Sequence, residues 1–386
     1  MLNKPVSYFV NWISAKSCFM QVLPLLLLTH FIALAGDGAC TAFSLRANNS
    51  LLAGKNLDWL VGEGIVVVNK RGAPKLSFVP PGEKAARWTS KYGSVTFNQF
   101  GIEFPLGGMN EAGLVVEELS YWPSGYPRNQ DREQINELQW IQYQLDNYRT
   151  VEEVISNLSN PEIRRYLFAL HYFIADRSGR SAVIEFISGG TRVYSGGDLP
   201  VPALSNNSYE NSIEDLSRYE GFGGELEIRN GPGSQERFVR AAWLLKQFVY
   251  TDQKAAVNYA FRILENVRQA DTQWSIVYDP EEMHIYLVTL GNDIRRYVDL
   301  NAADFSENKA AAILNIFRRC ESRVFNECFE EFSAGENRAL LQSVFEKLVR
   351  GGELERGEAD SLKTGLLEYQ MGILPAKPCK DKIDRK

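Results

Sequence analysis

Residues 40–59 read CTAFSLRANNSLLAGKNLDW, and this stretch decides the fold. Two apolar segments, CTAFSLRA and SLLAGKNL, flank the pair Asn48-Asn49. Asparagine is favoured in tight turns because its side chain bonds to its own backbone and tolerates positive φ. The stretch therefore predicts a β-hairpin whose first strand opens at Cys40.

An apolar run, VLPLLLLTHFIALA at residues 22–35, precedes the hairpin. It follows Lys4 and Lys16 and ends in the small residues Ala33-Leu34-Ala35. This layout is typical of a secretory signal, so we predict a signal peptide over residues 1–35. Cleavage there would leave a short pro-segment, residues 36–39, whose removal would make Cys40 the N-terminal residue.

An N-terminal Cys40 would carry a thiol and a free α-amine on one residue. A thiol nucleophile needs a base, usually a histidine, but an α-amine has a pKa of about 7.7–8.0 and can serve near neutrality. Outside the predicted signal the only histidines are His171 and His284, both in strand-like apolar stretches. A small buried residue is the competing interpretation of Cys40. A lipid-attachment cysteine is disfavoured because Asp37 occupies a position where that signal needs an aliphatic residue.

Composition excludes several functional classes. The 386 residues carry a formal net charge of −6 with a pI near 5.4, which argues against nucleic-acid partners. No apolar run after the signal approaches the ~18 residues of a membrane span. We therefore expect an exported protein, periplasmic or secreted. Charged residues make up 23% of the chain, a proportion typical of globular domains.

Three cysteines besides Cys40 remain after the predicted signal: Cys320, Cys328 and Cys379. An oxidising compartment could pair two of the three, but the sequence does not decide which. Metal ligation is disfavoured because no histidine accompanies these cysteines and no CxxC spacing occurs. If Cys40 is catalytic, its thiol must stay free.

Strand-like and helical segments alternate in blocks along the chain. Further strands are predicted at 64–70 and 94–100 and in hairpins around 177–180 and 280–282, and a turn is predicted at 107–113. Helices are predicted from about 133, from Val151 after a Thr150–Glu153 capping pattern, at 234–248 and at 252–267. Residues 208–233 are predicted to form a loop. Strands in antiparallel sense with helices in blocks predict an α+β fold, in which two stacked sheets lie between helical layers. Residues 306–386 are predicted to form a helical extension ending in a polar tail.

Five motifs in sequence order resemble those of the choloylglycine hydrolase family, which includes bile salt hydrolases and penicillin V acylases. They are Cys40-Thr41, the GKNLDW run ending in Asp58-Trp59, GMNEAGL at 108–114, LSNN at 204–207 and ERFVR at 236–240. The resemblance extends from Cys40 to about Thr289. It implies a four-layer αββα N-terminal-nucleophile hydrolase domain over residues 40–305, and it favours the nucleophile interpretation of Cys40.

The resemblance also implies roles for particular residues. Cys40 would attack the amide carbonyl while its own amine shuttles the proton, and Asp58 would hold the thiol or amine in register. Asn206 and Asn110 would form the oxyanion hole, where losing one donor typically costs about 10²–10³ in rate. Arg237 would lie close to the nucleophile and bias the thiol toward thiolate. Simple turn chemistry is the alternative for the two asparagines, and a solvated helix face is the alternative for Arg237.

Lys55 departs from the family pattern, which usually has arginine three residues before the aspartate. Lysine keeps the charge but lacks the planar fork of arginine, so we expect weaker positioning or different tuning of the site. We assign Lys55 a supporting role.

The implied reaction is hydrolysis of a linear amide through a thioester, with no metal or cofactor. Trp59, Tyr121 and Trp122 would line a pocket for an apolar acyl group, core packing being the alternative. An aromatic wall would suit phenoxyacetyl or fatty acyl chains at least as well as a steroid. Among relatives with an export signal, penicillin V acylase and acyl-homoserine-lactone acylase activities come first, and bile salt hydrolysis is the third choice. The resemblance also implies a homo-oligomer, but the sequence fixes neither the physiological substrate nor the assembly.

Other classes of function give different expectations. A papain-like hydrolase would depend on His171 or His284. An inactive secreted binding protein would not need Cys40, Asp58, Asn110, Asn206 and Arg237 together.

Overall fold

Two antiparallel β-sheets form the centre of the computed structural model, which describes residues 39–48, 50–126, 131–188, 190–307, 309–318 and 320–373. These residues belong to one compact unit. The predicted signal peptide, residues 36–38 and the tail from 374 lie outside the described residues. Within the described ranges, no helix is long and apolar enough to cross a bilayer.

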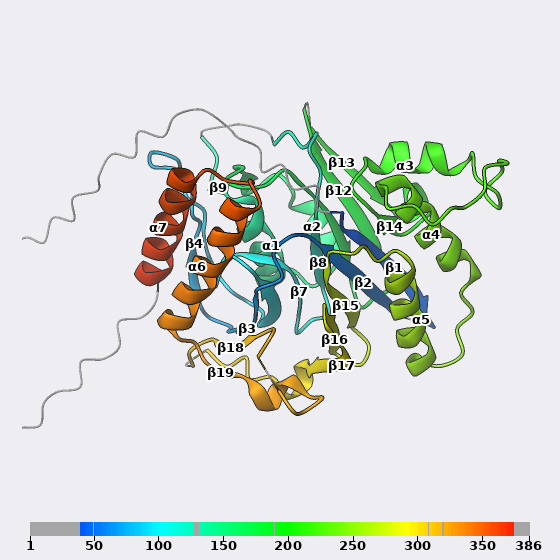
Figure 1. Ribbon diagram of the computed structural model, residues 1–386. Helices are drawn as coiled ribbons and strands as arrows, with labels where there is room; N and C mark the ends of the chain where they lie inside the picture. Colours follow the sequence, from blue (N-terminus) through cyan, green and yellow to red (C-terminus); the bar gives the residue numbers. More distant parts are fainter. Residues whose placement is uncertain are drawn as a thin grey trace, which may run out of the picture. The chain divides into compact units, whose positions relative to one another are not determined.

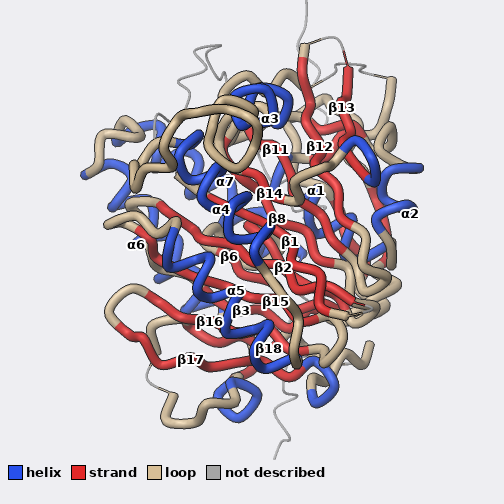
Figure 2. The backbone as a smooth tube through the Cα atoms, turned by 90° about the vertical axis from the view of Figure 1, so that its right-hand side faces the viewer, coloured by secondary structure: helices blue, strands red, loops and turns tan. Residues whose placement is uncertain are grey.

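The six-stranded sheet contains the predicted hairpin. Strand β1 (Thr41–Ala47) pairs antiparallel with β2 (Ser50–Asp58), and Asn48 takes a φ of +56° in the turn. The strand order is β14-β1-β2-β15-β16-β17. The other strands of this sheet are β14 (Ala203–Leu204), β15 (Thr272–Asp279), β16 (His284–Thr289) and β17 (Asn292–Asp299). Figure 2 shows β16 and β17 at its lower edge.

The second large sheet has nine strands in the order β13-β12-β11-β8-β7-β6-β3-β18-β19. Its strands are β3 (Ile65–Asn69), β6 (Ser94–Asn98), β7 (Pro105–Asn110), β8 (Val115–Ser120), β11 (Leu170–Ala175), β12 (Ser181–Ile187), β13 (Gly190–Ser195), β18 (Ala312–Asn315) and β19 (Glu330–Glu331). Two short pairs lie outside it: β4 (Pro74–Leu76) with β5 (Arg87–Thr89), and β9 (Gln134–Ile135) with β10 (Glu162–Ile163).

Helices cover the outer faces of both sheets. Helices α4 (Ser234–Gln247) and α5 (Gln253–Asn266) pack against β1, and α1 (Glu137–Asn147) packs against β7 and β8. Because β1 also contacts β8 and β11, the two sheets face each other. The resulting order of helix, sheet, sheet and helix confirms the predicted four-layer αββα fold (Figure 1).

The remaining helices are shorter or lie near the C-terminus. They are α2 (Val151–Ser156), α3 (Tyr209–Leu216), α6 (Ala334–Arg350), α7 (Arg356–Ile373) and the 3₁₀ turns Gly196–Asp198, Leu300–Ala302 and Phe325–Cys328. Side-chain caps define the starts of several: the Thr150 hydroxyl accepts from Glu153 N as the capping pattern predicts, and Asp252 caps α5.

Apolar packing between the sheets leaves little free space around the hairpin. Phe43 of β1 is fully buried, and its ring lies over Gly54 of β2. A Cβ atom at Gly54 would approach that ring to 2.5 Å, so the position requires glycine. The Phe43 ring thereby packs directly on the backbone of β2.

Two predicted segments differ from the structure. Residues 208–233, predicted as loop, contain α3, which begins after Ser208, whose side chain accepts from Asn211 N. Residues 306–386, predicted as helical, first form β18 and β19, and they become helical only from Ala334. Strand β18 pairs with β3, so burial on a sheet overrides the polar helix-like composition around it.

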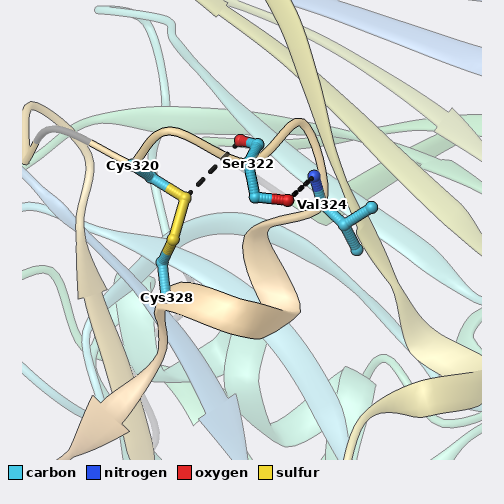
Figure 3. Close-up of a disulfide and its surroundings, with 4 residues drawn as sticks. All are labelled: Cys320, Ser322, Val324 and Cys328. Atoms are coloured by element: carbon cyan, nitrogen blue, oxygen red, sulfur yellow. Dashed lines mark hydrogen bonds between the residues drawn. A yellow bond between two sulfur atoms is a disulfide. The ribbon is translucent and has the colours of Figure 1, made fainter.

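A disulfide between Cys320 and Cys328 closes the segment that follows β18 (Figure 3). Between the two cysteines, the Ser322 hydroxyl accepts a 3.0 Å hydrogen bond from Val324 N. Of the alternatives left open by the sequence, the structure therefore pairs Cys320 with Cys328, while Cys379 lies outside the described residues.

We predict that Ile313→Ala lowers the free energy of unfolding by about 2–5 kcal/mol, because Ile313 is 3% exposed and pairs with Val67 in β3. Glu331→Ala, at an exposed position of β19, should change it by less than about 0.5 kcal/mol. Chemical denaturation measures both. Equal, small effects would mean that β18 is not part of the cooperative core.

Candidate active site

A pocket opens where the N-terminus of β1 and the C-terminus of β2 meet strands of the other sheet. Its lining combines apolar and acidic groups: Cys40, Leu57, Asp58, Trp59, Leu106, Glu118, Ser120, Trp122, Phe168 and Ala169. Of the residues with a predicted site role, Cys40, Asp58, Trp59 and Trp122 are therefore brought together directly.

Cys40 is one of the residues that line the pocket, with 3% of its surface exposed, and its thiol is free. Burial raises the pKa of this thiol to about 12, against a partly opposing effect of the nearby Lys55 ammonium. The chain is continuous from Ala39 to Cys40, so the Cys40 nitrogen is an amide, and Ala39 N donates to Asp58 O at 3.1 Å. In this form the thiol is protonated near neutral pH and has no free amine beside it.

Asp58 is completely buried at the end of β2. Its Oδ1 accepts a hydrogen bond from the Thr272 hydroxyl, whereas its Oδ2 has no hydrogen-bond partner among the residues that the structure describes. Burial raises the pKa of this carboxyl to about 7, although Thr272 and the Arg237 guanidinium favour its charged form. Burying an oxygen without a hydrogen bond costs free energy of folding, so Asp58 Oδ2 is available to accept from a donor placed next to it.

Arg237 connects the start of β1 with the loop after β14. Its Nη1 donates to the Cys40 carbonyl at 2.5 Å and to the Thr41 hydroxyl at 2.6 Å, and its Nη2 donates to Asn206 Oδ1 at 2.8 Å. The residue is 1% exposed, so the alternative of a solvated helix-face arginine is wrong. Burial lowers the pKa of Arg237 from its ordinary value, while Asp58 and Cys40 oppose that effect.

Asn206 is oriented by both ends of its amide. Its Oδ1 accepts from Arg237, and its Nδ2 donates to Ser120 O at 2.9 Å. The amide nitrogen carries two hydrogens, so one remains for another acceptor at the edge of the pocket that Ser120 lines.

Lys55 lies in a buried cluster rather than in contact with Asp58. Its Nζ donates to Glu118 O at 2.6 Å and Glu118 Oε1 at 2.9 Å, and it lies 3.1 Å from Glu117 Oε2. Three acceptors use the three N–H donors of an ammonium. Burial lowers the pKa of Lys55, but the Glu118 and Glu117 carboxylates outweigh burial and raise that pKa overall.

Glu117 extends this cluster away from the pocket. The Tyr278 hydroxyl donates to Glu117 Oε1, and a Cβ atom at Gly107 would approach Glu117 Oε2 to 2.2 Å. Burial raises the pKa of Glu117 to about 7 although Lys55 opposes this effect. A compact lysine ammonium thus occupies a position enclosed by two carboxyl groups, where the fork of an arginine would need more room.

The prediction that Asn110 contributes to the oxyanion hole is wrong. Asn110 ends β7, four residues beyond Leu106, which lines the pocket, and this separation corresponds to about 13 Å along a strand. Its Nδ2 donates to Leu145 O and Tyr148 O, both at 2.8 Å. Its Oδ1 accepts from Ala112 N and Leu114 N, so the whole side chain is used in joining the β7–β8 turn to the end of α1.

The prediction that Tyr121 lines the acyl pocket is also wrong. Successive side chains of an extended segment point to opposite sides. Ser120 and Trp122 face the pocket, whereas Tyr121 stacks on the His171 ring with centroids 4.7 Å apart. Trp59 and Trp122 do line the pocket, and Trp122 is 41% exposed at its rim.

The two histidines lie in strands, His171 in β11 and His284 in β16, as the sequence predicted. His171 Nδ1 lies 3.4 Å from Glu185 Oε1, and His284 Nδ1 lies 3.3 Å from the Tyr286 hydroxyl. Neither is among the residues that line the pocket with Cys40. This arrangement disfavours a papain-like cysteine–histidine pair.

Sequence reasoning missed Glu117, Glu118, Ser120, Thr272 and Tyr278. The signal available for the first pair was two adjacent acidic residues directly after the apolar run Leu114–Val116, in a segment predicted to enter the core. Two acids at that position predict a buried cation partner, and Lys55 is that partner. Thr272 and Tyr278 carry no local signal because they belong to a strand that is distant in sequence.

Comparison with known proteins agrees with this fold. Residues 40–304 match the family described as linear amide C–N hydrolases, choloylglycine hydrolase family. The chain therefore belongs to that family and is a hydrolase of carbon–nitrogen bonds other than peptide bonds in linear amides.

Individual relatives are distant. Penicillin V acylase from Pectobacterium atrosepticum is 25% identical over 272 residues, covering 60% of this chain and 72% of that protein. The structure of penicillin V acylase from Agrobacterium tumefaciens has a TM-score of 0.67 and 25% identity, covering 76% of this chain and 98% of that one. A conjugated bile acid hydrolase variant from Clostridium perfringens has a TM-score of 0.59 and 20% identity over 74% of this chain and 98% of that one, which supports the fold.

We predict that Glu117→Gln flattens the pH dependence of stability. Folded Glu117 keeps its proton up to a pH of about 7, whereas the unfolded chain releases it near 4.5, so the folded state binds more protons between these values. Stability from this group therefore falls as pH rises through that window. Melting temperatures between pH 4.5 and 8 should decline less steeply in the variant than in the unaltered protein. Curves of melting temperature against pH that run parallel in the two proteins would contradict the raised pKa of Glu117.

Proposed function

We propose that Cys40, released as the N-terminal residue, is the nucleophile of this amide hydrolase and that the pocket takes the apolar acyl group of an N-acyl amide. The observation that carries the proposal is the buried, unpartnered Asp58 Oδ2 next to a buried free thiol. A new ammonium or amine at Cys40 would be the donor that this oxygen lacks.

The raised pKa of the thiol explains why a released amine would be needed. Burial raises the pKa of Cys40 to about 12, so little thiolate exists near pH 7 in the unprocessed chain. Lys55 is protonated and uses its donors on Glu118 and Glu117. The α-amine of Cys40 would take the thiol proton and later give it to the leaving amine.

Acylation would then proceed in the pocket. The sulfur attacks the carbonyl carbon, the carbon–nitrogen bond breaks after the amine leaving group receives the proton, and a thioester on Cys40 remains. The second Nδ2 hydrogen of Asn206 would stabilise the oxyanion, and Arg237 would hold Asn206 in place through Oδ1. Water activated by the same amine would hydrolyse the thioester.

Three aromatic rings line the pocket: Trp59, Trp122 and Phe168. Flat apolar walls favour an aryloxyacetyl or straight acyl chain, so we propose activity like that of penicillin V acylases or acyl-homoserine-lactone acylases. Conjugated bile salts are the alternative substrate class.

We further propose that the enzyme is exported before it acts. The Cys320–Cys328 disulfide is supporting evidence because disulfides persist mainly in oxidising compartments. The predicted signal peptide over residues 1–35 would supply the route.

The decisive experiment is the N-terminal sequence and intact mass of the exported protein, followed by assays on penicillin V, long-chain acyl-homoserine lactones and glycocholate. We expect a chain that begins at Cys40 and hydrolyses one of the first two substrates. Cys40→Ala should abolish turnover while the melting temperature stays similar. Turnover that survives in Cys40→Ala would refute the nucleophile, and turnover of glycocholate alone would favour the bile-salt class. A chain that keeps residues 36–39 and has no activity would favour a binding protein.

The two asparagines should respond in opposite ways. Asn206→Ala should lower kcat by about 10²–10³ with a similar melting temperature, because it removes an oxyanion donor. Asn110→Ala should destabilise the fold by about 1–3 kcal/mol, because it leaves backbone groups unpaired, and should leave kcat nearly unchanged. Steady-state kinetics and thermal melting separate the two outcomes, and a large loss of kcat in Asn110→Ala would reverse our correction.

A further inference from the structure

The helix pair α6–α7 lies beyond the residues that match the family, which end at 304. In Figure 1 the pair lies on the side of the sheets opposite to α4 and α5. It contacts residues 59–63 after β2, which carry the lining residue Trp59, and residues 99–104 between β6 and β7, which carry Phe100 behind the lining.

Aromatic rings connect α6 with the pocket. Phe345 of α6 is 2% exposed, and its ring packs edge-on against Phe100 with centroids 6.1 Å apart. Phe100 in turn packs against Phe168 at 5.4 Å and Trp59 at 6.3 Å. Because Trp59 and Phe168 line the pocket, Phe345 stands in the second layer behind its wall.

Two buried amides fix the backbone that carries Phe100. Gln370 Nε2 donates to Phe100 O at 2.8 Å and Ile102 O at 2.9 Å, and Asn337 Oδ1 accepts from Ile102 N at 3.1 Å. Asn337 Nδ2 completes the network by donating to Gln370 Oε1 at 2.6 Å. Gly101, at a φ of +77°, leaves room for both amides, since a Cβ atom there would lie 2.6 Å from each. The position of Phe100 is therefore set by α6 and α7 together.

Helix α6 also holds the segment that carries Trp59. Glu63 Oε1 lies 2.7 Å from Lys347 Nζ and accepts from the Ser343 hydroxyl at 3.2 Å. Leu60 packs over Gly351 at the end of the helix. The segment that carries Trp59 and the segment that carries Phe100 are thus anchored to one helix pair.

We propose that α6–α7 is the outer layer of the acyl pocket and that Phe345, as a positioning residue acting through Phe100, determines which acyl groups fit between Trp59 and Phe168. This inference rests on the proposed function of the pocket. The helix pair touches none of the reacting groups, so it should affect acyl selectivity and leave the chemistry of Cys40 unchanged.

The test compares Phe345→Ala with Phe325→Ala. Phe325 is also buried, at 1% exposure, but it packs against Arg296 in another part of the C-terminal segment. With N-acyl amides of one amine and graded acyl size, Phe345→Ala should shift the ratio of kcat/KM about tenfold toward bulkier acyl groups, mainly through KM. Phe325→Ala should leave that ratio unchanged even where it lowers the melting temperature. If the alanine variant folds poorly, Phe345→Leu replaces it in the test as a milder substitution.

A binding measurement separates this inference from the proposed reaction. Free carboxylic acids of the same graded size are titrated calorimetrically into the full-length Cys40→Ala protein with and without Phe345→Ala. A shift in size preference supports the inference even if the unaltered protein hydrolyses no amide, which would by itself refute the proposed function. Identical size profiles, a shift shared with Phe325→Ala, or no binding of any acid would overturn the inference.

Discussion

The register of β1 against β2 is the constraint on which the pocket depends. Thr41 lies opposite Asn56, so Cys40 and Asp58 meet at the open end of the hairpin. Arg237 secures that end by bonding to the Cys40 carbonyl and the Thr41 hydroxyl. The hairpin lies between helices and the second sheet, so the thiol and the carboxyl are both removed from water. Their raised pKa values are consequences of this placement.

The buried ammonium of Lys55 lies next to buried carboxyl groups of opposite charge. Lys55 would be costly to bury alone, and Glu118 and Glu117 surround it. Glu118 also lines the pocket, so the charges of this cluster extend to it. The lysine at position 55 therefore has its own buried partners, because two carboxyl groups lie around its ammonium and Gly107 leaves room for Glu117.

Alternation, asparagine turns and helix periodicity predicted the hairpin and the layered fold, because these depend on local patterns. The residues around Cys40, Arg237 among them, were predicted from the resemblance of short motifs to those of the family, and the motif that carries Arg237 is continuous along α4. The sequence-based prediction failed where the side chain of a motif residue hydrogen-bonds to backbone groups instead of facing the pocket. Asn110 belongs to a conspicuous motif, yet pairing within the sheet places it at the far end of β7. Thr272 and Tyr278 could not be predicted because their contacts with Asp58 and Glu117 exist only after distant strands pair.

The strand order has a consequence for the time at which this protein can fold. Strand β2 pairs with β15, and Asp58 and Thr272, which hydrogen-bond there, are 214 residues apart. Strand β3 pairs with β18, which lies still later in the chain. Neither large sheet can be completed until most of the polypeptide exists, and pairings of such separation form slowly. A chain with this topology therefore leaves strand edges of both large sheets without their partners until late in its synthesis.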